Sequence, residues 1–381
     1  MPGYFFKPLD AEYFENVEIQ SESLCIEVVS RDGLALQYVI EQTDKICLAA
    51  VKEYGGALQY VKKQTPEICM AAVKNYGCAL EYVKDKSYEI CMAAVKEFGL
   101  ALEYVKDKTE ELCLLAIRQN GLAIWKIEDQ TLDMCLIAVN QNPRALKGVK
   151  NQTKEICLTA IRRNGFALED VRDQTEEICL EAVKKYGATL EFVKNQTREI
   201  CLAAVREDGK ALRFVKKQTN EICLEAVKNR GRALYYVKDQ TEEICLAAIW
   251  REVDSFSLVL CQTESLCLKA VTRNPAALWF VKNKTEEDVR KGTCSLSPMA
   301  YEAICSAAVK VHSSALKYVE NEECFHRVAM EAVRRYPEAI QYIKNQTEEL
   351  CIAVAERDSY YLKYVKDEEM RKRMEKHVLD S

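Results

Sequence analysis

A cysteine recurs at every twenty-second position of this chain of 381 residues, twelve times in succession without a slip. The twelve are Cys25, Cys47, Cys69, Cys91, Cys113, Cys135, Cys157, Cys179, Cys201, Cys223, Cys245 and Cys267. A fixed period of this length is the sequence signature of a tandem array. A unit of this size cannot bury its own apolar side chains, so neighbouring units must share one continuous core.

The unit from Thr175 to Gln196 has the pattern of a helical hairpin with unequal arms. Thr175 is a favourable N-cap, and the two glutamates after it place negative charge at the positive end of the helix dipole. Apolar residues at helical spacing continue to Tyr186, and Gly187 is expected to end the helix in the left-handed conformation. Residues 188–194 are too few for an independent helix and are expected to form a packed short α or 3₁₀ helix. The pattern predicts an all-α solenoid of about fifteen such hairpins, stacked into a superhelix.

The repeat is regular over residues 21–285 and irregular beyond them. Residues 286–299 interrupt the period and are expected to be an insertion, whereas residues 300–366 continue the pattern as divergent repeats. Residues 1–20 and 367–381 are expected to cap the two ends, the second as a charged helix. Caps are needed because an array with open ends would stack on itself.

The cysteines are expected to be reduced. Equivalent helices of adjacent repeats should lie about 8–10 Å apart, beyond the Cα separation of about 7 Å that a disulfide tolerates. Buried free thiols are typical of a cytosol-like compartment. No apolar run approaches the roughly 20 residues needed to cross a bilayer, and the net charge of −5 gives no overall attraction to nucleic acid or an anionic membrane. We therefore expect a cytoplasmic protein that does not enter a membrane.

No residue pattern predicts catalysis, a cofactor or a metal site. The chain has no Cys-x-x-Cys pair, and its three histidines are far apart in the sequence. Twelve equivalent cysteines favour packing over the single activated thiol that nucleophilic catalysis needs. Four Asn-x-Thr sequences are interpreted as turns before N-cap threonines rather than glycosylation sites. We therefore expect no enzymatic activity.

Units such as Gln64 to Lys84 follow the pattern Gln-Thr-x-Glu-Ile-Cys-x-x-Ala-Val-Lys-x-x-Gly-x-Ala-Leu-x-Tyr-Val-Lys. This pattern resembles the domain of unknown function 4116, a short α-helical tandem repeat that is common in giant DNA viruses of protists and in some amoeba-associated bacteria. The resemblance is strong over residues 40–285. It implies an intracellular helical-repeat protein and, for a viral source, one that acts in the host cytoplasm or is carried in the virion. It supplies no catalytic or binding residues.

Two columns of basic residues recur along the array. The long-helix column comprises Lys52, Lys74, Lys96, Arg118, Arg162, Lys184, Arg206 and Lys228, and the short-helix column comprises Lys62, Lys84, Lys106, Lys150, Arg172, Lys194, Lys216 and Lys238. Stacked about 10 Å apart, such residues could follow the phosphates of single-stranded RNA. Lysine is also favoured at helix C-termini by the helix dipole, without any ligand, and a glutamate column at the helix starts balances the charge. A single-stranded RNA-binding solenoid is therefore the alternative hypothesis.

One column of the short helix varies in identity while the frame around it stays constant, and we predict that it is exposed. It comprises Gln59, Glu81, Glu103, Trp125, Lys147, Glu169, Glu191, Arg213, Tyr235, Ser257, Trp279, Lys317 and Gln341. Exposed tryptophans frequently anchor protein interfaces. Trp250 and Trp279 are expected to pack beneath the irregular stretches beside them, which leaves Trp125 as the better candidate.

Three consecutive repeats around Trp125 break the aromatic pattern, either to form a partner site or to change the curvature of the superhelix. Asparagine replaces the aromatic residue before the glycine position, and Lys126, Gly148 and Asp170 replace the aromatic residue of the short helix. The candidate partner-binding residues are Arg118, Asn120, Trp125, Lys126, Asn142, Arg144, Lys147, Arg162, Arg163, Asn164, Asp170 and Arg172. The sequence thus favours a non-catalytic scaffold for protein–protein interaction, centred on residues 118–172.

Overall fold

The computed structural model describes residues 20–281 and 296–380, and every regular element in these ranges is helical. Each repeat is an α-helix followed by a 3₁₀ helix of six residues, and the described residues contain fifteen 3₁₀ helices, each of which follows an α-helix. The predicted all-α array of two-helix repeats is therefore confirmed. The chain divides into two compact units, Met1–Ala182 and Val183–Ser381.

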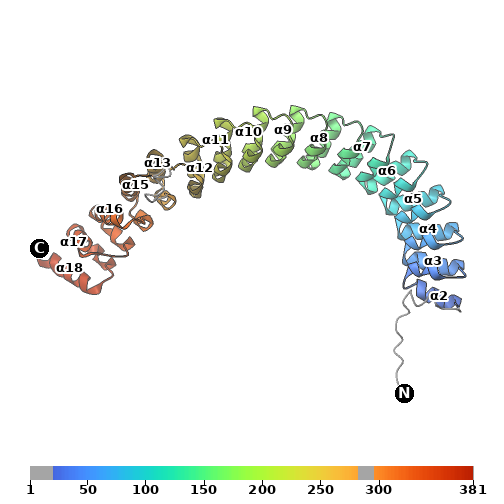
Figure 1. Ribbon diagram of the computed structural model, residues 1–381, viewed down its shortest axis with the longest axis horizontal. Helices are drawn as coiled ribbons and strands as arrows, with labels where there is room; N and C mark the ends of the chain where they lie inside the picture. The colour runs from blue at the N-terminus through green and yellow to red at the C-terminus, as the bar shows by residue number, and fades with distance from the viewer. Residues whose placement is uncertain (1–19, 282–295, 381) are drawn as a thin grey trace, which may run out of the picture. The chain divides into compact units, whose positions relative to one another are not determined.

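The first unit contains seven complete α-helices in its described part, α2 to α8, and the 3₁₀ helices η1 to η7 (Figure 1). The α-helices are α2 (Glu22–Val29), α3 (Asp44–Glu53), α4 (Pro66–Asn75), α5 (Tyr88–Glu97), α6 (Glu110–Gln119), α7 (Leu132–Gln141) and α8 (Lys154–Arg163). The 3₁₀ helices are η1 (Gly33–Tyr38), η2 (Gly55–Tyr60), η3 (Gly77–Tyr82), η4 (Gly99–Tyr104), η5 (Gly121–Lys126), η6 (Pro143–Gly148) and η7 (Gly165–Asp170). The boundary between the units falls within α9 (Glu176–Lys185).

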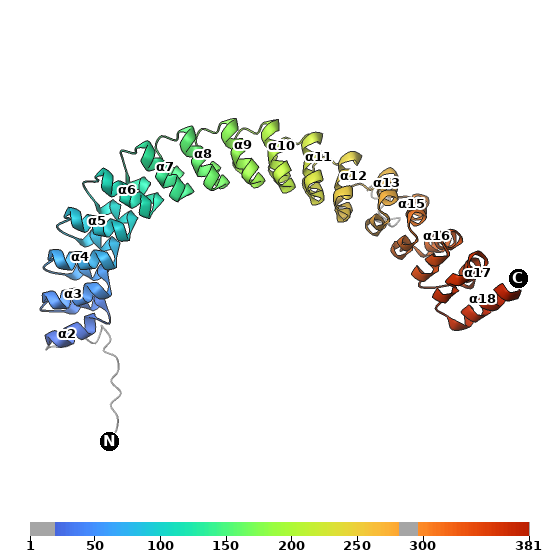
Figure 2. The same ribbon diagram turned by 180° about the vertical axis from the view of Figure 1, so that it is seen from behind.

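The second unit continues the alternation (Figure 2). Its α-helices are α10 (Arg198–Glu207), α11 (Asn220–Asn229), α12 (Glu242–Arg251), α13 (Glu264–Arg273), α15 (Pro298–Val311), α16 (Glu322–Arg335), α17 (Glu348–Arg357) and α18 (Glu368–Asp380). Its 3₁₀ helices are η8 (Gly187–Phe192), η9 (Gly209–Phe214), η10 (Gly231–Tyr236), η11 (Val253–Leu258), η12 (Pro275–Phe280), η13 (Ser313–Tyr318), η14 (Pro337–Tyr342) and η15 (Ser359–Tyr364).

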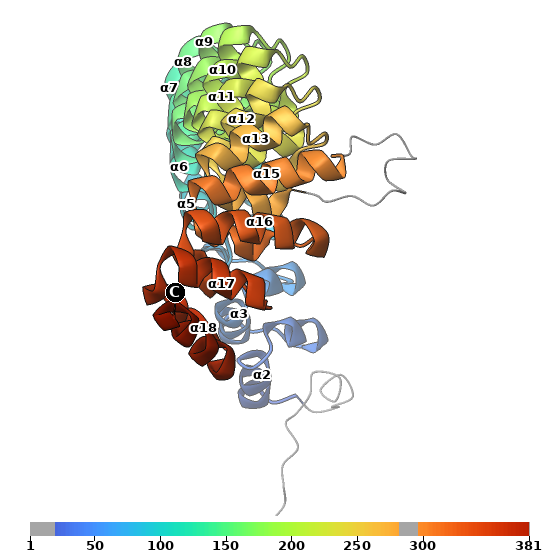
Figure 3. The same cartoon turned by 90° about the vertical axis from the view of Figure 1, so that its left-hand side faces the viewer.

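Each unit consists of two packed layers. An α-helix contacts the α-helices of the adjacent repeats, and a 3₁₀ helix contacts the adjacent 3₁₀ helices. Figure 3 shows α10 to α13 following one another in this manner. The shared core consists of isoleucine, cysteine, alanine and valine from the long helix, with alanine, leucine and valine from the short one; Ile68, Val73 and Leu80 are fully buried. The threonine caps form as expected, because the Thr65 hydroxyl accepts a hydrogen bond from the backbone N–H of Ile68 at 3.4 Å.

The expectation of a left-handed glycine at the end of the long helix is wrong. Tyr186 is the extended residue between the two helices, with φ −146° and ψ 105°, and Gly187 is the first residue of η8. A Cβ on Gly187 would collide with the carbonyl oxygen of Ala204 in the next repeat. Glycine is favoured here by the close approach of the neighbouring backbone rather than by its dihedral angles, and several other repeats begin the short helix with proline, serine or valine instead. The short helix consequently starts one residue earlier than predicted and ends at Phe192, two residues before the expected end.

The irregular segments are partly described. Residues 1–19 of the expected N-terminal cap and residues 286–295 of the expected insertion lie outside the described residues. The α15 helix begins at Pro298 with Ser297 as its N-cap, so the last two residues assigned to the insertion belong to this helix. Proline suits the first turn because backbone N–H groups there make no intrahelical hydrogen bond, so its lack of an N–H costs nothing. At the other end, α18 lies within the segment expected to be a cap helix.

One cysteine contradicts the expectation that all thiols are reduced. Sixteen cysteines lie outside any disulfide, and all of these except Cys78 are buried. Cys261, however, is disulfide-bonded. Its position explains the exception, because Cys261 lies in the turn between η11 and α13 rather than in the buried helical column. The distance between stacked helices, which argued against disulfides between the column cysteines, therefore does not apply to Cys261.

We expect native alkylation to modify Cys78 first and to leave the buried cysteines unmodified until the chain unfolds. Burial raises the pKa of Cys245 to about 11 and that of Cys267 to about 12, so few of these thiols are thiolates at pH 8. Unfolded cysteines ionise near pH 8.5, so stability should fall as the pH rises from about 9 towards 11. Quenched iodoacetamide labelling with mass spectrometry, with Cys78→Ser as the control, measures the order of modification. Rapid native labelling of several column cysteines contradicts the packing role.

Candidate interaction surface

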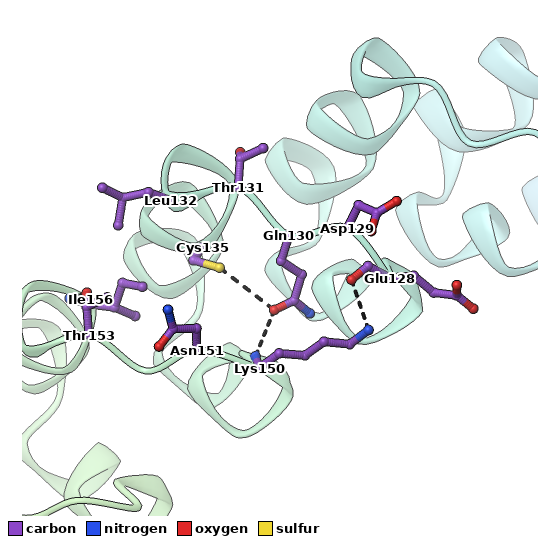
Figure 4. Close-up of a pocket in the computed structure, with 10 residues that line it drawn as sticks. All are labelled: Glu128, Asp129, Gln130, Thr131, Leu132, Cys135, Lys150, Asn151, Thr153 and Ile156. Carbon is purple, nitrogen blue, oxygen red and sulfur yellow. Dashed lines mark hydrogen bonds between the residues drawn. The ribbon is translucent and has the colours of Figure 1, made fainter.

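A glutamine in most of the turns connects adjacent repeats, a role that the repeat pattern alone did not predict. The Gln130 amide donates to the carbonyl of Gly148 at 2.9 Å, and its oxygen accepts from the backbone N–H of Lys150 at 2.8 Å. The same oxygen accepts from the thiol of Cys135 at 3.9 Å (Figure 4). We call this set of contacts the glutamine bridge. The recurrence of glutamine five residues before the cysteine was the signal for it.

A hollow of about 390 Å³ lies beside this bridge, lined by Gln130, Thr131, Cys135 and Lys150 among others (Figure 4). A second hollow, of about 440 Å³, is lined by Gln196, Thr197, Cys201 and Lys216 among others in the second unit. The two sets of residues occupy equivalent repeat positions, three periods apart in the sequence. The hollow is therefore a property of the repeat frame rather than a single specialised site.

A second polar column joins the repeats at the opposite end of the long helix. The side-chain oxygen of Gln119 accepts from the backbone N–H of Gly99 in the preceding repeat at 2.7 Å, and its amide donates to the Glu97 carbonyl at 3.2 Å. Gln141 repeats the first contact with Gly121, also at 2.7 Å. Polar side chains thus satisfy backbone groups at both ends of the hairpin.

The short-helix basic column contacts the protein itself. The ammonium of Lys150 donates to the carbonyl of Glu128 at 2.9 Å, and the guanidinium of Arg172 donates to the carbonyls of Lys150 and Val149, both at 2.8 Å. Lys216 makes the equivalent contact with the Lys194 carbonyl at 2.9 Å in the second unit. These cations stabilise the junction between repeats, which reduces their availability to phosphates.

The long-helix basic column lies on the other side of the hairpin. Arg162 pairs with Glu181 at 3.4 Å, and Arg206 pairs with Glu225 at 2.8 Å. Acidic side chains from the following repeat are therefore interspersed with this column, as the balanced charge of the sequence suggested.

The variable column of the short helix is exposed at every one of its thirteen positions, as predicted. In η5 the Trp125 side chain is 50% exposed and lies over Gly148 of η6. A Cβ at residue 148 would collide with the indole and lie 2.7 Å from its Cγ. The loss of the aromatic residue at position 148 thus makes room for the tryptophan of the preceding repeat.

The asparagines of the central break cap the 3₁₀ helices. The side-chain oxygen of Asn120 accepts from the N–H of Leu122 at 3.0 Å, and that of Asn142 accepts from the N–H of Arg144, also at 3.0 Å. Asn164 makes the same contact with Phe166 at 3.1 Å. The aromatic residues that precede η2, η3 and η4 make no such side-chain cap. These asparagines therefore have a structural role.

Charged side chains lie beside Trp125 on the same exposed layer. Lys126 pairs with Glu103 at 2.7 Å. Asp170 is half-buried; burial and the neighbouring Glu169 raise the pKa of its carboxyl group, whereas Lys147 and Arg144 oppose the rise. We call Trp125, Lys126, Arg144, Lys147 and Asp170 the central face.

The structure separates the remaining candidate residues from this face. Arg118, Arg162 and Arg163 lie in the last turns of α6 and α8, in the other helical layer. Arg172 contacts backbone carbonyls, and the three asparagines cap 3₁₀ helices. The twelve candidates thus include one group on the short-helix layer, the central face, and several residues with other roles. Within the central face, Trp125, Arg144 and Lys147 are exposed, and Lys126 and Asp170 are half-buried.

The expectation that Trp250 and Trp279 pack beneath irregular segments is wrong. Their side chains are 48% and 62% exposed. The guanidinium of Arg273 lies 4.4 Å from the centre of the Trp250 ring, and the Trp279 ring packs edge-on against Tyr318 at 5.7 Å. Both tryptophans occupy positions that carry polar residues in other repeats. Side chains at these positions face solvent even where the next segment is irregular.

Comparison with protein families identifies the repeat. The model of the Domain of unknown function (DUF4116) matches residues 44–86, 87–132, 153–196, 175–218 and 197–242. The repeats of residues 44–132 and 153–242 are therefore similar to those of this family. Successive matches from residue 153 onward are offset by 22 residues, so one DUF4116 domain corresponds to two of the hairpins described above. No curated protein matches the chain.

Within residues 20–281 and 296–380, no helix combines the length and the apolar content that crossing a bilayer requires. In the same ranges, no three histidine, cysteine or acidic side chains converge in a way that could hold a metal ion.

Proposed function

We propose that this helical-repeat array is a non-catalytic scaffold that binds a protein partner through the central face. The observation that carries the proposal is the position of Trp125, which is half-exposed and seated on Gly148. Exposed tryptophan and arginine side chains are the residues that most often dominate binding energy in protein interfaces. A tryptophan held against backbone loses little conformational entropy on binding.

The mixed charge of the central face supports a protein partner over a nucleic acid. Lys147 and Arg144 lie beside the Asp170 carboxyl group, and Lys126 is paired with Glu103. A polyanion would meet carboxylates at each step, whereas protein interfaces commonly combine both signs of charge around an aromatic anchor. The contacts of the short-helix basic column with carbonyls further weaken the alternative of an RNA-binding solenoid.

We place this role in the cytoplasm, in keeping with the sixteen described cysteines that lie outside any disulfide; the disulfide of Cys261 does not support this placement. The resemblance to repeats of giant viruses makes a host cytoplasm the setting to test first if the chain is viral.

Trp125→Ala is expected to abolish capture of the partner from lysate of the native cell, whereas Trp250→Ala is expected to retain it. The two tryptophans have nearly equal exposure, 50% and 48%, but only Trp125 lies on the central face. Affinity capture with quantitative mass spectrometry identifies proteins that are lost with the first variant alone, and calorimetry with the purified partner measures the loss, expected to be at least about tenfold. Identical partners and affinities for the two variants contradict the proposal.

A further inference from the structure

The variable column changes its chemistry within the second unit. In the first unit it presents acids at Glu81, Glu103 and Glu169, whereas after Glu191 its exposed members include Arg213, Tyr235, Trp279 and Lys317. Lys363 occupies the same position in η15. After Glu191, the described column thus holds three basic and two aromatic residues, together with the neutral Ser257 and Gln341. We call Arg213, Tyr235, Trp279, Lys317, Tyr360 and Lys363 the C-terminal strip.

Three cations of this strip are held over aromatic rings. The Arg213 guanidinium lies 4.4 Å from the centre of the Phe214 ring, and the Lys317 ammonium lies 4.8 Å from that of Tyr318. The Lys363 ammonium lies 3.5 Å from the centre of the Tyr360 ring and 5.1 Å from that of Tyr364. Cation–π contacts of this kind restrict the side chains without neutralising them. Each charge is therefore positioned in advance for an anionic partner.

Large aromatic side chains lie between these cations and remain exposed. Tyr235 is 71% exposed, Trp279 is 62% exposed and Tyr360 is 65% exposed. Trp279 contacts Tyr318 and Tyr360 contacts Tyr361, in both cases edge to face. Several exposed aromatic groups along one layer indicate a binding surface more strongly than a single exposed side chain does.

Nearby acids only partly offset the positive charge of the strip. Lys210 and Arg232 lie on the same layer as the strip, at the second position of their 3₁₀ helices, and Asp254 and Glu338 occupy that position in other repeats. Arg232 pairs with Asp254 at 3.3 Å, so these two charges cancel. The described strip is therefore positive on a chain whose net charge is −5.

We infer that the C-terminal strip binds an extended, acidic peptide segment of a partner protein. Its carboxylates would pair with Arg213, Lys317 and Lys363, and its apolar side chains would pack on Tyr235, Trp279 and Tyr360. Adjacent repeats lie about 10 Å apart, which equals about three residues of an extended chain. A peptide with acidic residues separated by multiples of about three therefore fits the spacing of the cations.

The same contacts disfavour single-stranded nucleic acid. Base stacking needs an open ring face, and cations of the chain cover faces of Phe214, Tyr318 and Tyr360, so stacking by bases would depend mainly on Tyr235 and Trp279. The charges themselves stay accessible, so ion pairing with carboxylates remains possible where base stacking is hindered. The inference does not rest on the central face, which lies in the other unit.

A synthetic peptide of about twenty residues, long enough to span the six repeat steps from Arg213 to Lys363 at about three residues a step, tests the inference on the full chain; it carries glutamate at every third position and leucine or phenylalanine between. Fluorescence anisotropy should show micromolar binding at low salt, with a control peptide that carries lysine for glutamate at least tenfold weaker. Combined Arg213→Glu, Lys317→Glu and Lys363→Glu should weaken binding of the acidic peptide at least tenfold. Lys228→Glu, on the long helix α11 of the same unit, is the matched charge control and should bind as the unmodified chain does.

A second variant and a second probe make the outcome decisive. Trp279→Ala with Tyr235→Ala removes aromatic contacts and leaves every charge, and it should also weaken peptide binding. Oligouridylate of the same length is the nucleic-acid probe. Equal binding of acidic and basic peptides, unchanged binding by both sets of variants, or tighter binding of oligouridylate that the charge reversals abolish would each overturn the inference. Trp125→Ala should leave the peptide affinity unchanged, which separates this test from that of the proposed function.

Discussion

Gly55→Ala should lower the free energy of unfolding by about 2–3 kcal/mol, as overpacking against rigid backbone does, whereas Gly56→Ala should change it by less than about 0.5 kcal/mol. A Cβ on Gly55 would collide with the Ala72 carbonyl oxygen and lie 2.8 Å from the Cβ of Tyr76, both in the next repeat. The neighbouring helix could relieve this contact only by moving away, which would open the shared core.

The adjacent glycine provides the matched control. A Cβ on Gly56 would meet only the outer atoms of the Tyr54 ring, which can rotate aside. Other repeats carry Leu34, Cys78 and Leu100 at the position of Gly56. Some repeats also carry a side chain at the position of Gly55, such as Pro143 and Val253, so the expected difference rests on the contacts of this pair of repeats: rigid backbone at Gly55 and a movable ring at Gly56. Urea denaturation of the two purified variants, followed by circular dichroism, measures the difference. Equal stability of the variants would show that the array adjusts its spacing freely.

The sequence was sufficient to predict the repeat architecture, because the 22-residue period and the pattern of polar and apolar residues indicate which positions are buried. Threonine caps, the buried cysteine column and the exposed variable column all follow from residues that face one environment in every repeat. Gly187 was misinterpreted because a glycine after a helix has two possible causes. A left-handed residue and a close neighbouring backbone both favour glycine, and only coordinates distinguish the two.

The candidate site was predicted less completely than the frame. Trp125 was identified correctly as an exposed aromatic residue in a break of the pattern. Its contact with Gly148 was not predicted, because the two residues belong to different repeats and nothing in the sequence shows that they touch. The asparagines were grouped with Trp125 because all depart from the consensus at the same place. Their role as caps of the 3₁₀ helices became visible only with the hydrogen bonds.

Gln64→Leu should lower the free energy of unfolding by about 2 kcal/mol, the loss expected when hydrogen bonds to partly buried backbone groups are removed. The Gln64 amide donates to the Tyr82 carbonyl at 2.9 Å, and its oxygen accepts from the N–H of Lys84 at 2.9 Å and from the Cys69 thiol at 3.6 Å. Leucine preserves the approximate volume but satisfies none of these groups. Gln64→Glu is the intermediate case, because a carboxylate keeps the acceptor and loses the donor.

The chain contains a natural test of this glutamine bridge. Lys86 and Lys108 occupy the glutamine position in two consecutive repeats, and a lysine side chain has no acceptor for the backbone N–H of the next repeat. Lys86 instead donates to the carbonyl of Val83 within its own turn, at 2.7 Å. Lys108→Gln should therefore raise the free energy of unfolding by about 1 kcal/mol, the value of a typical net hydrogen bond.

Opposite effects of Gln64→Leu and Lys108→Gln at equivalent positions would show that the polar contacts between repeats set the coupling along the array. Hydrogen exchange resolves where the coupling changes, because the effect should centre on the junction that carries the substitution. If neither substitution alters stability or local exchange, apolar packing alone joins the repeats, and the glutamine serves only the turn. If the glutamine bridge contributes to stability, it also explains why a 3₁₀ helix of only six residues is stable. The glutamine amide binds the backbone carbonyl of the last residue of that helix.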